Sequence, residues 1–379
     1  MINPFQYGGV VGKDAFCNRK KELADLVRAM ENGERLFVYS ERRIGKTSLI
    51  RQALTKLPKG NYLSAYVDLW PTDGEESFSI ATAKALTEGL STTTDKMLQT
   101  AKKFFTRMTP SITSDSSGNP QIGFQFSKSG VTRPDLDEVL SAPVKIASSR
   151  KSRIVVVFDE FQRILEYGND LVERTIRSAI QDQPRVSYIF LGSRKHLIQK
   201  MFLDQSRPLC RAGGHYPLRE IDIKDWLPFI RVRFRKSDKG ITDNMIYSVY
   251  RMTDGHPFYT QHLCHAIWEL CETGDQVTEK LINSAVGLLL ERENYAYTAL
   301  WDSLALNQRR VLTGLAREPE RVKVFSSDFL LSYNLRSPSN VQRAVESLLE
   351  KDIIDRNDGS FVISDRFFKI WINQTGFPA

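Results

Sequence analysis

The chain has 379 residues, of which 41% are hydrophobic and 26% are charged, and its formal net charge is +8. This composition excludes a disordered, fibrous or disulfide-stapled chain, and the length predicts two or three domains. No apolar run approaches the roughly 20 residues that span a bilayer, and the first 12 residues lack a secretory signal. We therefore expect a cytoplasmic protein with reduced cysteines and no membrane partner.

The positive charge is concentrated in two blocks. Residues 1–60 carry 12 basic and 6 acidic side chains, and residues 194–239 carry 12 and 5. The C-terminal segment 302–379 carries 11 and 10, so it is almost neutral. A basic excess indicates a polyanionic partner such as a nucleotide or a nucleic acid, and this distribution favours the two blocks over the C-terminal segment as the contact.

A phosphate-binding loop is the first motif in the chain. Residues 36–39 form a short apolar run that predicts a buried strand, and the loop and a helical pattern follow. Lys46 would reach the β- and γ-phosphates, and Thr47 would complete a Mg²⁺ shell. The alternative is a chance Gly-Lys-Thr at a helix start. The nucleotide-binding candidates are Ser40, which replaces the first glycine of the motif, and Arg42, Arg43, Ile44, Gly45, Lys46, Thr47 and Ser48.

Residues 91–150 are polar and interrupt the expected core. Two segments of period-two alternation, 109–113 and 121–126, flank a Ser-Gly-Asn turn and predict a β-hairpin within about residues 105–130. Such a hairpin can bind a partner, touch DNA or only decorate the surface.

A second acidic motif follows this insertion. The β-branched run 153–158 predicts a strand in the centre of a sheet, and Asp159 and Glu160 come directly after it. Open α/β sheets bind ligands at this edge. Asp159 is the candidate for holding Mg²⁺ through water, and Glu160 for orienting and deprotonating the attacking water. A pair of acidic residues that only caps the next helix is the alternative. Residues 63–68 predict a further strand.

A third buried strand is predicted at residues 188–192, with Ser193 at its end. Ser193 either senses the γ-phosphate, which makes it a catalytic candidate with Lys46 and Glu160, or caps the following helix. No arginine finger is marked in the sequence. The basic residues after this strand either act in trans between subunits or form salt bridges and a solvated face; they are Arg194, Arg207 and Arg211.

These motifs belong to a longer ordered set. The set comprises Asn3-Pro4-Phe5, Phe16-x-Asn18-Arg19-x-x-Glu22-Leu23, Arg42–Thr47, Tyr66–Leu69, Val157–Gln162 and Gly255-His256-Pro257-Phe258-Tyr259. In this order the motifs resemble the archaeal-type ATPases of the STAND/AAA+ P-loop superfamily, which are related in architecture to the Orc/Cdc6 initiators. The resemblance covers most of residues 1–300 and departs from the family at Ser40, where glycine is usual.

The resemblance implies an α/β fold: a P-loop core with a parallel sheet flanked by helices, a helical lid and a C-terminal winged helix-turn-helix domain. ATP and Mg²⁺ are the implied cofactors. It also implies that Arg19 lies near the adenine and that the lid closes over the nucleotide, with Pro257 on the base and His256 close to the phosphates. From the residues alone, a plain turn between helices is the simpler interpretation of residues 255–257.

After Trp301 the pattern predicts three helices and a hairpin. The helices are expected at 307–317, 326–332 and 338–350, the last one capped by Ser337, and two short strands flank an Asn-Asp-Gly turn. This order is typical of a winged helix. The near-neutral charge of the segment favours the alternative of a module that packs on protein. The candidates for contacting DNA are Arg336, Gln342, Arg343 and Arg356.

We therefore expect three domains: an ATPase core at 1–220, a lid at 221–300 and the winged helix at 301–379. The predicted function is an ATP-binding and ATP-hydrolysing switch, slow without a partner. It would couple nucleotide state to assembly with further copies of the chain and to binding of double-stranded DNA or protein. The alternative is a signalling- or defence-type switch or scaffold that binds proteins without DNA and hydrolyses little or no ATP.

Overall fold

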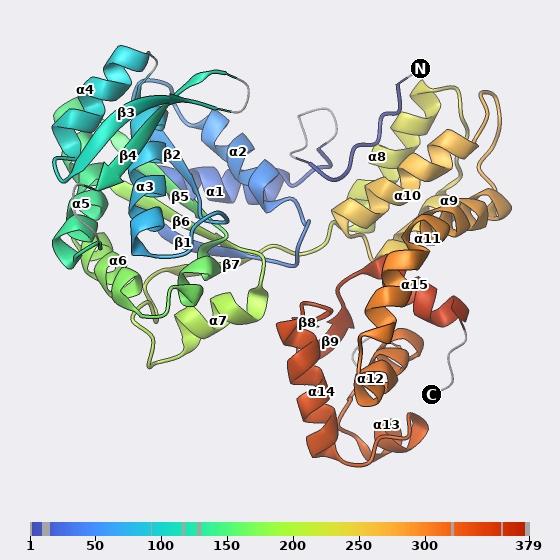
Figure 1. Cartoon of the computed structure of the whole chain (residues 1–379). Coiled ribbons are helices and arrows are strands. Elements are labelled where there is room, and N and C mark those ends of the chain that lie inside the picture. Colours follow the sequence, from blue (N-terminus) through green and yellow to red (C-terminus); the bar gives the residue numbers. More distant parts are fainter. Residues whose placement is uncertain are drawn as a thin grey trace. The chain divides into compact units, whose positions relative to one another are not determined.

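The computed structural model describes residues 2–9, 16–91, 93–115, 118–126, 130–319, 322–357 and 359–375. Asp358 of the predicted turn lies outside the described residues. The chain divides into two compact units, whose elements are labelled in Figure 1. The sheet unit consists of Arg19–Ser40 and Lys46–Leu218, and the helical unit consists of Met1–Asn18, Glu41–Gly45 and Arg219–Ala379.

Five parallel strands form the centre of the sheet unit. They lie in the order β2-β5-β6-β1-β7, with the bounds Tyr62–Asp68, Arg153–Asp159, Val186–Gly192, Arg35–Tyr39 and Gly214–Pro217. Every residue of β6 is buried, and so is every residue of β5 after the first. Burial on both faces explains why these strands are continuous apolar runs. The predicted α/β fold with a parallel sheet is confirmed.

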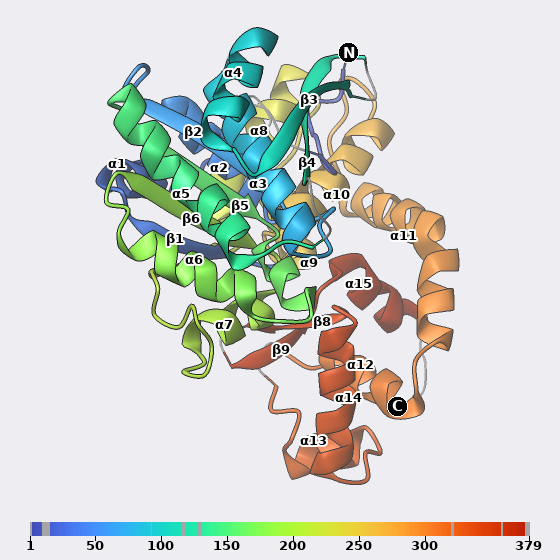
Figure 2. The same ribbon diagram turned by 60° about the vertical axis from the view of Figure 1, so that its left-hand side comes forward.

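Both faces of the sheet are covered, and Figure 2 shows α3, α5 and α6 lying over one of them. Val156 and Phe158 of β5 belong to the core cluster on that face, whereas Val155 and Val157 are buried on the opposite face. The helices of the sheet unit are α1 Lys20–Asn32, α2 Lys46–Lys56, α3 Glu75–Leu90, α4 Thr94–Phe104, α5 Arg133–Arg150, the 3₁₀ helix η2 Phe161–Glu166, α6 Leu171–Gln181 and α7 Lys195–Leu203.

The insertion contains an antiparallel hairpin formed by β3 Met108–Ser114 and β4 Pro120–Phe126. Ile122 and Phe124 of β4 are buried and belong to the same core cluster as the central strands. One face of the hairpin is therefore part of the core, and the hairpin is more than a decoration of the surface.

The helices of the helical unit share one hydrophobic core. None of the helices in the described part of the chain is both long and apolar enough to cross a membrane. The elements are α8 Ile223–Lys236, α9 Asp243–Thr253, α10 Pro257–Leu270, α11 Glu279–Asp302, α12 Leu306–Arg317, α13 Ser327–Ser332, α14 Pro338–Glu350, β8 Ile354–Asn357, β9 Ser360–Ile363 and α15 Arg366–Thr375. The hydroxyl of Ser337 caps α14, as the sequence predicts. The boundary expected at residue 300 falls inside α11.

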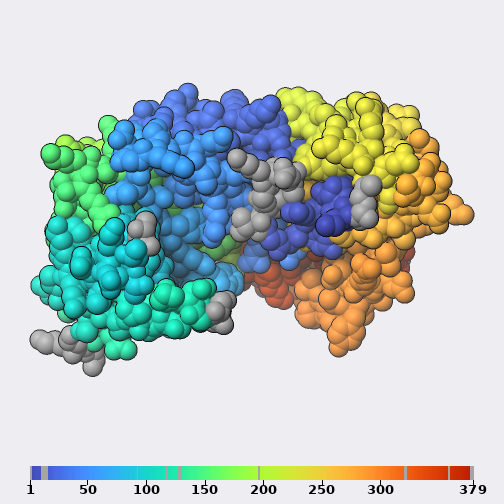
Figure 3. All heavy atoms as spheres, turned by 90° about the horizontal axis from the view of Figure 1, so that it is seen from above, coloured from blue at the N-terminus to red at the C-terminus, as the bar shows by residue number. Residues whose placement is uncertain are grey.

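The N-terminal residues pack on the helices of the helical unit. Phe5 is buried against Phe229 and Phe234 of α8, and its carbonyl oxygen lies 2.9 Å from His265 Nδ1 of α10. Figure 3 shows this dark blue segment beside the yellow and orange helices. The Asn-Pro-Phe motif thus anchors the start of the chain in the helical unit, although the sequence assigns it to the ATPase core.

Candidate functional site

The phosphate loop joins β1 to α2. Gly45 (φ 91°) and Arg43 (φ 60°) adopt left-handed backbone conformations, and Ser40 does not. A residue with a side chain is therefore tolerated at the position where the motif has glycine. The Ser40 hydroxyl accepts a hydrogen bond of 3.0 Å from Lys46 Nζ. Ile44 and Lys46 are buried, and so is Ser48 on the first turn of α2.

Asp159 ends β5 and lies beside the start of α2. Its Oδ2 accepts a hydrogen bond of 3.0 Å from Thr47 Oγ1 and a second one from the Tyr66 hydroxyl, and its Oδ1 accepts one of 2.9 Å from Glu160 N. Burial raises the pKa of Tyr66, and the nearby carboxylate of Asp159 raises it further, so the phenol remains a donor. A hydroxyl and a carboxylate are oxygen ligands of the kind that Mg²⁺ prefers, so Thr47 and Asp159 fit that ion.

Glu160 adopts a left-handed backbone conformation (φ 51°, ψ 42°) at the start of η2. Its Oε2 accepts hydrogen bonds from Ser193 Oγ (2.7 Å) and from Gln162 Nε2. The N-cap of α7 is Arg194, so Ser193 does not cap that helix. The Ser193 hydroxyl instead donates its hydrogen bond to the carboxylate of Glu160. We did not predict a role for Gln162, which is 2% exposed. The signals in the sequence are its place two residues after Glu160 and its position at the end of the motif Val157–Gln162.

A buried arginine of α15 contacts the phosphate loop within the helical unit. Arg366 is 3% exposed, and its guanidinium lies 3.0 Å from Glu41 Oε2. The same guanidinium lies 3.1 Å from Asp254 Oδ2 and 3.8 Å from Glu220 Oε1. Burial alone would lower the pKa of Arg366, but the three carboxylates outweigh burial and the pKa is raised. Nothing in the sequence spacing indicates this cluster.

Further contacts hold the same loop residues. His256 Nε2 lies 3.0 Å from Arg42 O, and Arg42 Nη2 lies 2.8 Å from Asp352 Oδ2. The guanidinium of Arg43 lies 4.4 Å from the centre of the Phe258 ring. Residues of the motif at 255–259 therefore contact Arg42 and Arg43, and His256 lies against the backbone of Arg42.

Arg19 and Pro257 are the two residues predicted to lie near the base. Arg19 is buried at the start of α1 in a left-handed conformation (φ 58°), and its Nη1 lies 3.2 Å from Glu22 Oε1. Pro257 is the first residue of α10, a position that suits proline. Contact of either residue with a base stays a prediction.

The basic residues after β6 include two that form ion pairs. Arg194 Nη1 lies 3.6 Å from Glu166 Oε1, and Arg207 forms an ion pair with the buried Glu173. Arg211 is exposed and adopts a left-handed conformation (φ 55°). The salt-bridge alternative therefore describes Arg194 and Arg207 in this structure, and a role in trans stays a prediction for all three.

The residues predicted to contact DNA are all exposed: Gln342 and Arg343 on α14, Arg356 on β8, and Arg336 in the loop before α14. Gln342 Nε2 donates to Glu346 Oε1 (2.9 Å), and Arg343 Nη2 donates to Asn340 Oδ1 (2.6 Å). The carboxylate of Glu346 thus occupies the side-chain amide of Gln342, one of the groups predicted to contact DNA.

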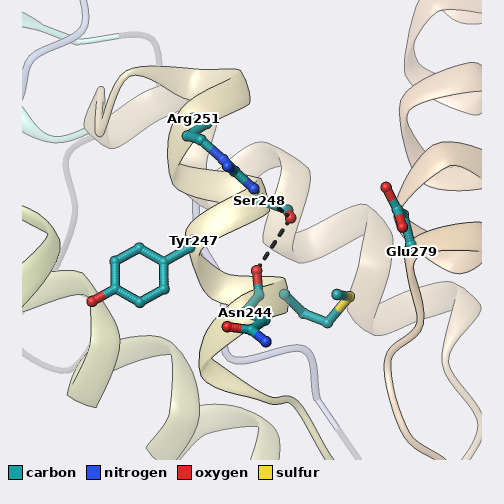
Figure 4. A pocket seen from close by; sticks show the side chains of 6 residues that line it. Asn244, Tyr247, Ser248, Arg251 and Glu279 are labelled. Atoms are coloured by element: carbon teal, nitrogen blue, oxygen red, sulfur yellow. Dashed lines mark hydrogen bonds between the residues drawn. The ribbon is translucent and has the colours of Figure 1, made fainter.

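A shallow depression of about 430 Å³ lies along α9 (Figure 4). It contains none of the predicted site residues. The hydroxyl of Ser248 donates to Asn244 O and accepts a hydrogen bond from Arg251, so this hydroxyl is paired within the helix. The lining consists of Asn244, Met245, Tyr247, Ser248, Arg251 and Glu279.

Two family models match the chain. The first, described as an ATPase domain predominantly from Archaea, matches residues 16–299, and the second, described as a probable winged helix domain, matches residues 295–374. No curated protein matches the sequence.

Solved structures with the same fold include the Walker-type ATPase paby2304 of Pyrococcus abyssi. It is 17% identical with a TM-score of 0.61, and the alignment covers 95% of this chain and 97% of that one. The Aeropyrum pernix ORC2 protein in ADPNP–ADP complexes is 14% identical with a TM-score of 0.49 and 94% coverage of each chain. The likeness to the Pyrococcus abyssi ATPase, at 17% identity, shows the fold alone.

The Ser40–Lys46 hydrogen bond leads to a first prediction. If the ammonium of Lys46 gives up its bond to Ser40 when it meets a phosphate, binding loses a hydrogen bond that contributes about 1 kcal/mol. We expect Ser40→Ala to tighten ATP binding by about two- to fivefold for that reason. Ser40→Gly should give the same change, because the backbone of residue 40 does not need glycine. Titration with a fluorescent ATP analogue measures both, and affinities equal to that of the parent would contradict the interpretation.

Proposed function

Because the chain belongs to the family of ATPase domains that come predominantly from Archaea, and a winged helix domain follows, we propose that it is a Mg²⁺-dependent ATPase acting as a molecular switch. The switch couples nucleotide state to self-assembly and to binding of DNA or protein. Nucleotide binding and ATPase activity follow from the family, and the remaining steps are argued from the residues.

The proposed chemistry assigns one task to each group. Lys46 and the N–H groups at the start of α2 bind the β- and γ-phosphates. Thr47 and Asp159 hold Mg²⁺, which when bound neutralises phosphate charge. Glu160 accepts a proton from the water that attacks the γ-phosphorus, and ADP leaves as the bond to the β-phosphate oxygen breaks. Ser193 donates to Glu160 and so orients this base.

The observation that supports a switch is the ion cluster of Arg366. This residue lies in the segment matched by the winged helix model, and one of its carboxylates, Glu41, lies in the phosphate loop. A buried guanidinium that loses a carboxylate costs several kcal/mol, so a loop that moves on binding phosphate has to alter the cluster. Nucleotide state and the arrangement of α15 are then linked by a coupling free energy.

Replacing Glu160 tests hydrolysis. Glu160→Gln keeps the shape of the side chain and removes the proton acceptor, so we expect turnover to fall at least about tenfold while ATP binding is retained. Glu76→Gln, an exposed carboxylate on α3, is the matched control and should not change turnover. Equal phosphate release by the parent and Glu160→Gln would overturn the catalytic assignment. Release by both at the rate of a protein-free control would favour a scaffold that does not hydrolyse ATP.

Replacing Glu41 tests the switch. We expect ATP to change hydrogen exchange in α15 of the parent, and we expect Glu41→Gln to reduce that change by at least about half, because the loop then has no charge for Arg366. Glu220→Gln removes a carboxylate of the same guanidinium from outside the loop and serves as control. If both variants respond to ATP as the parent does, the cluster does not couple the loop to α15.

A second candidate function is a switch that binds protein without DNA. The observation in its favour is the bond from Gln342 to Glu346 on a nearly neutral winged helix. Size-exclusion chromatography with ADP or a non-hydrolysable ATP analogue, with and without duplex DNA, separates the two. DNA retention that depends on ATP and weakens steeply with salt is the result expected for the DNA-coupled switch. Nucleotide-dependent assembly with no DNA retention at any salt concentration would favour the protein-binding form.

A further inference from the structure

The Tyr66 hydroxyl is bonded to the carboxylate that we assign to Mg²⁺, and the chemistry described above makes no use of it. β2 and β5 are parallel neighbours in which Tyr66 lies opposite Val157. Tyr66 and Asp159 are therefore on the same face of adjacent strands, two positions apart. The hydroxyl donates to Asp159 Oδ2, the oxygen that also accepts from Thr47.

The groups that donate hydrogen bonds to Asp159 leave its negative charge available to a cation. The carboxylate is 7% exposed, and a buried carboxylate needs hydrogen bonds to remain charged. The donors described for it are the hydroxyls of Thr47 and Tyr66 and the N–H of Glu160, and none of the three is charged. They fix the direction of the carboxylate without neutralising it, so its charge remains available to a metal ion.

Tyr66 is itself held in place. Its ring faces the guanidinium of Arg51 on α2, 5.1 Å from the ring centre. The backbone of Tyr66 lies within β2, between residues that pair with β5. A strand and a helix thus fix the phenol, and the phenol fixes Asp159 relative to Thr47 on the same helix.

We propose that Tyr66 is a positioning residue for the Mg²⁺ site. It orients the carboxylate of Asp159 toward the metal that binds with ATP, and this inference rests on the proposed Mg²⁺-dependent nucleotide site. Without the hydroxyl, the bond from Thr47 is the one left among those that the described residues make to Asp159 Oδ2, and Thr47 would also hold the metal. The carboxylate then rotates more freely and holds Mg²⁺ more weakly.

The test is a Mg²⁺ titration of fluorescent ATP analogue binding, carried out on the full chain with Glu160→Gln so that turnover does not interfere. We expect Tyr66→Phe to raise the Mg²⁺ concentration at half-maximal binding by about five- to tenfold, and to leave binding in EDTA unchanged. The matched control is Tyr62→Phe on the same strand, whose hydroxyl donates to Glu31 O at 3.4 Å. It should titrate like the parent.

A double-mutant comparison tests whether the effect passes through Asp159. Added to Asp159→Asn, Tyr66→Phe should change the Mg²⁺ midpoint by less than about twofold, because the acceptor it orients is already lost. Equal Mg²⁺ midpoints for the Glu160→Gln chain with and without Tyr66→Phe would overturn the inference. So would a loss of analogue binding in EDTA, or a full additive effect with Asp159→Asn, since each indicates a structural role. A parent that binds the analogue without responding to Mg²⁺ would overturn the proposed metal site, and the inference with it.

Discussion

Helices bury both faces of the central sheet, so polar groups carried by its strands can meet a ligand only where the strands end. The order β5-β6-β1 then determines the site. The acidic pair, Ser193 and the phosphate loop follow these three neighbouring strands, although Ser193 comes about 150 residues after the loop along the chain. The parallel direction of the strands delivers all three segments to one edge, and this explains how Ser193 reaches Glu160 and Thr47 reaches Asp159.

The phosphate loop is held differently along its length. Its ends, Ser40 and Lys46, belong to the sheet unit, and residues 41–45 belong to the helical unit. Arg366 holds the middle of the loop through its buried ion pair with Glu41, and separating two buried charges is costly. A partly exposed pair such as Arg194–Glu166 contributes far less, because water screens both charges. The loop is therefore restrained by buried charge at Glu41, one of the positions that the motif leaves open to any residue.

Local patterns account for what the sequence predicts well. Buried strands, the phosphate loop, the acidic pair and the helix at 338–350 are each defined by neighbouring residues, and α14 has those same bounds. The roles of Tyr66 and Arg366 escaped prediction, although Tyr66 lies in one of the motifs, because neither spacing nor motif indicates which distant side chain each of them contacts. Gln162 is adjacent to Glu160, but its bond depends on the left-handed backbone of Glu160. The hairpin was predictable from alternation, whereas the burial of its inner face depends on tertiary packing.

The helix α11 has a mechanical consequence. It contains 24 residues, so it is about 36 Å long, and both family matches include its residues 295–299. A continuous helix offers no hinge between the segments that it joins, and it therefore acts as a lever arm. Tilting its first turn by about 10° would carry its last turn through about 6 Å. A small change in the packing of helices around the first turn of α11 would therefore move its last turn by about the diameter of a side chain.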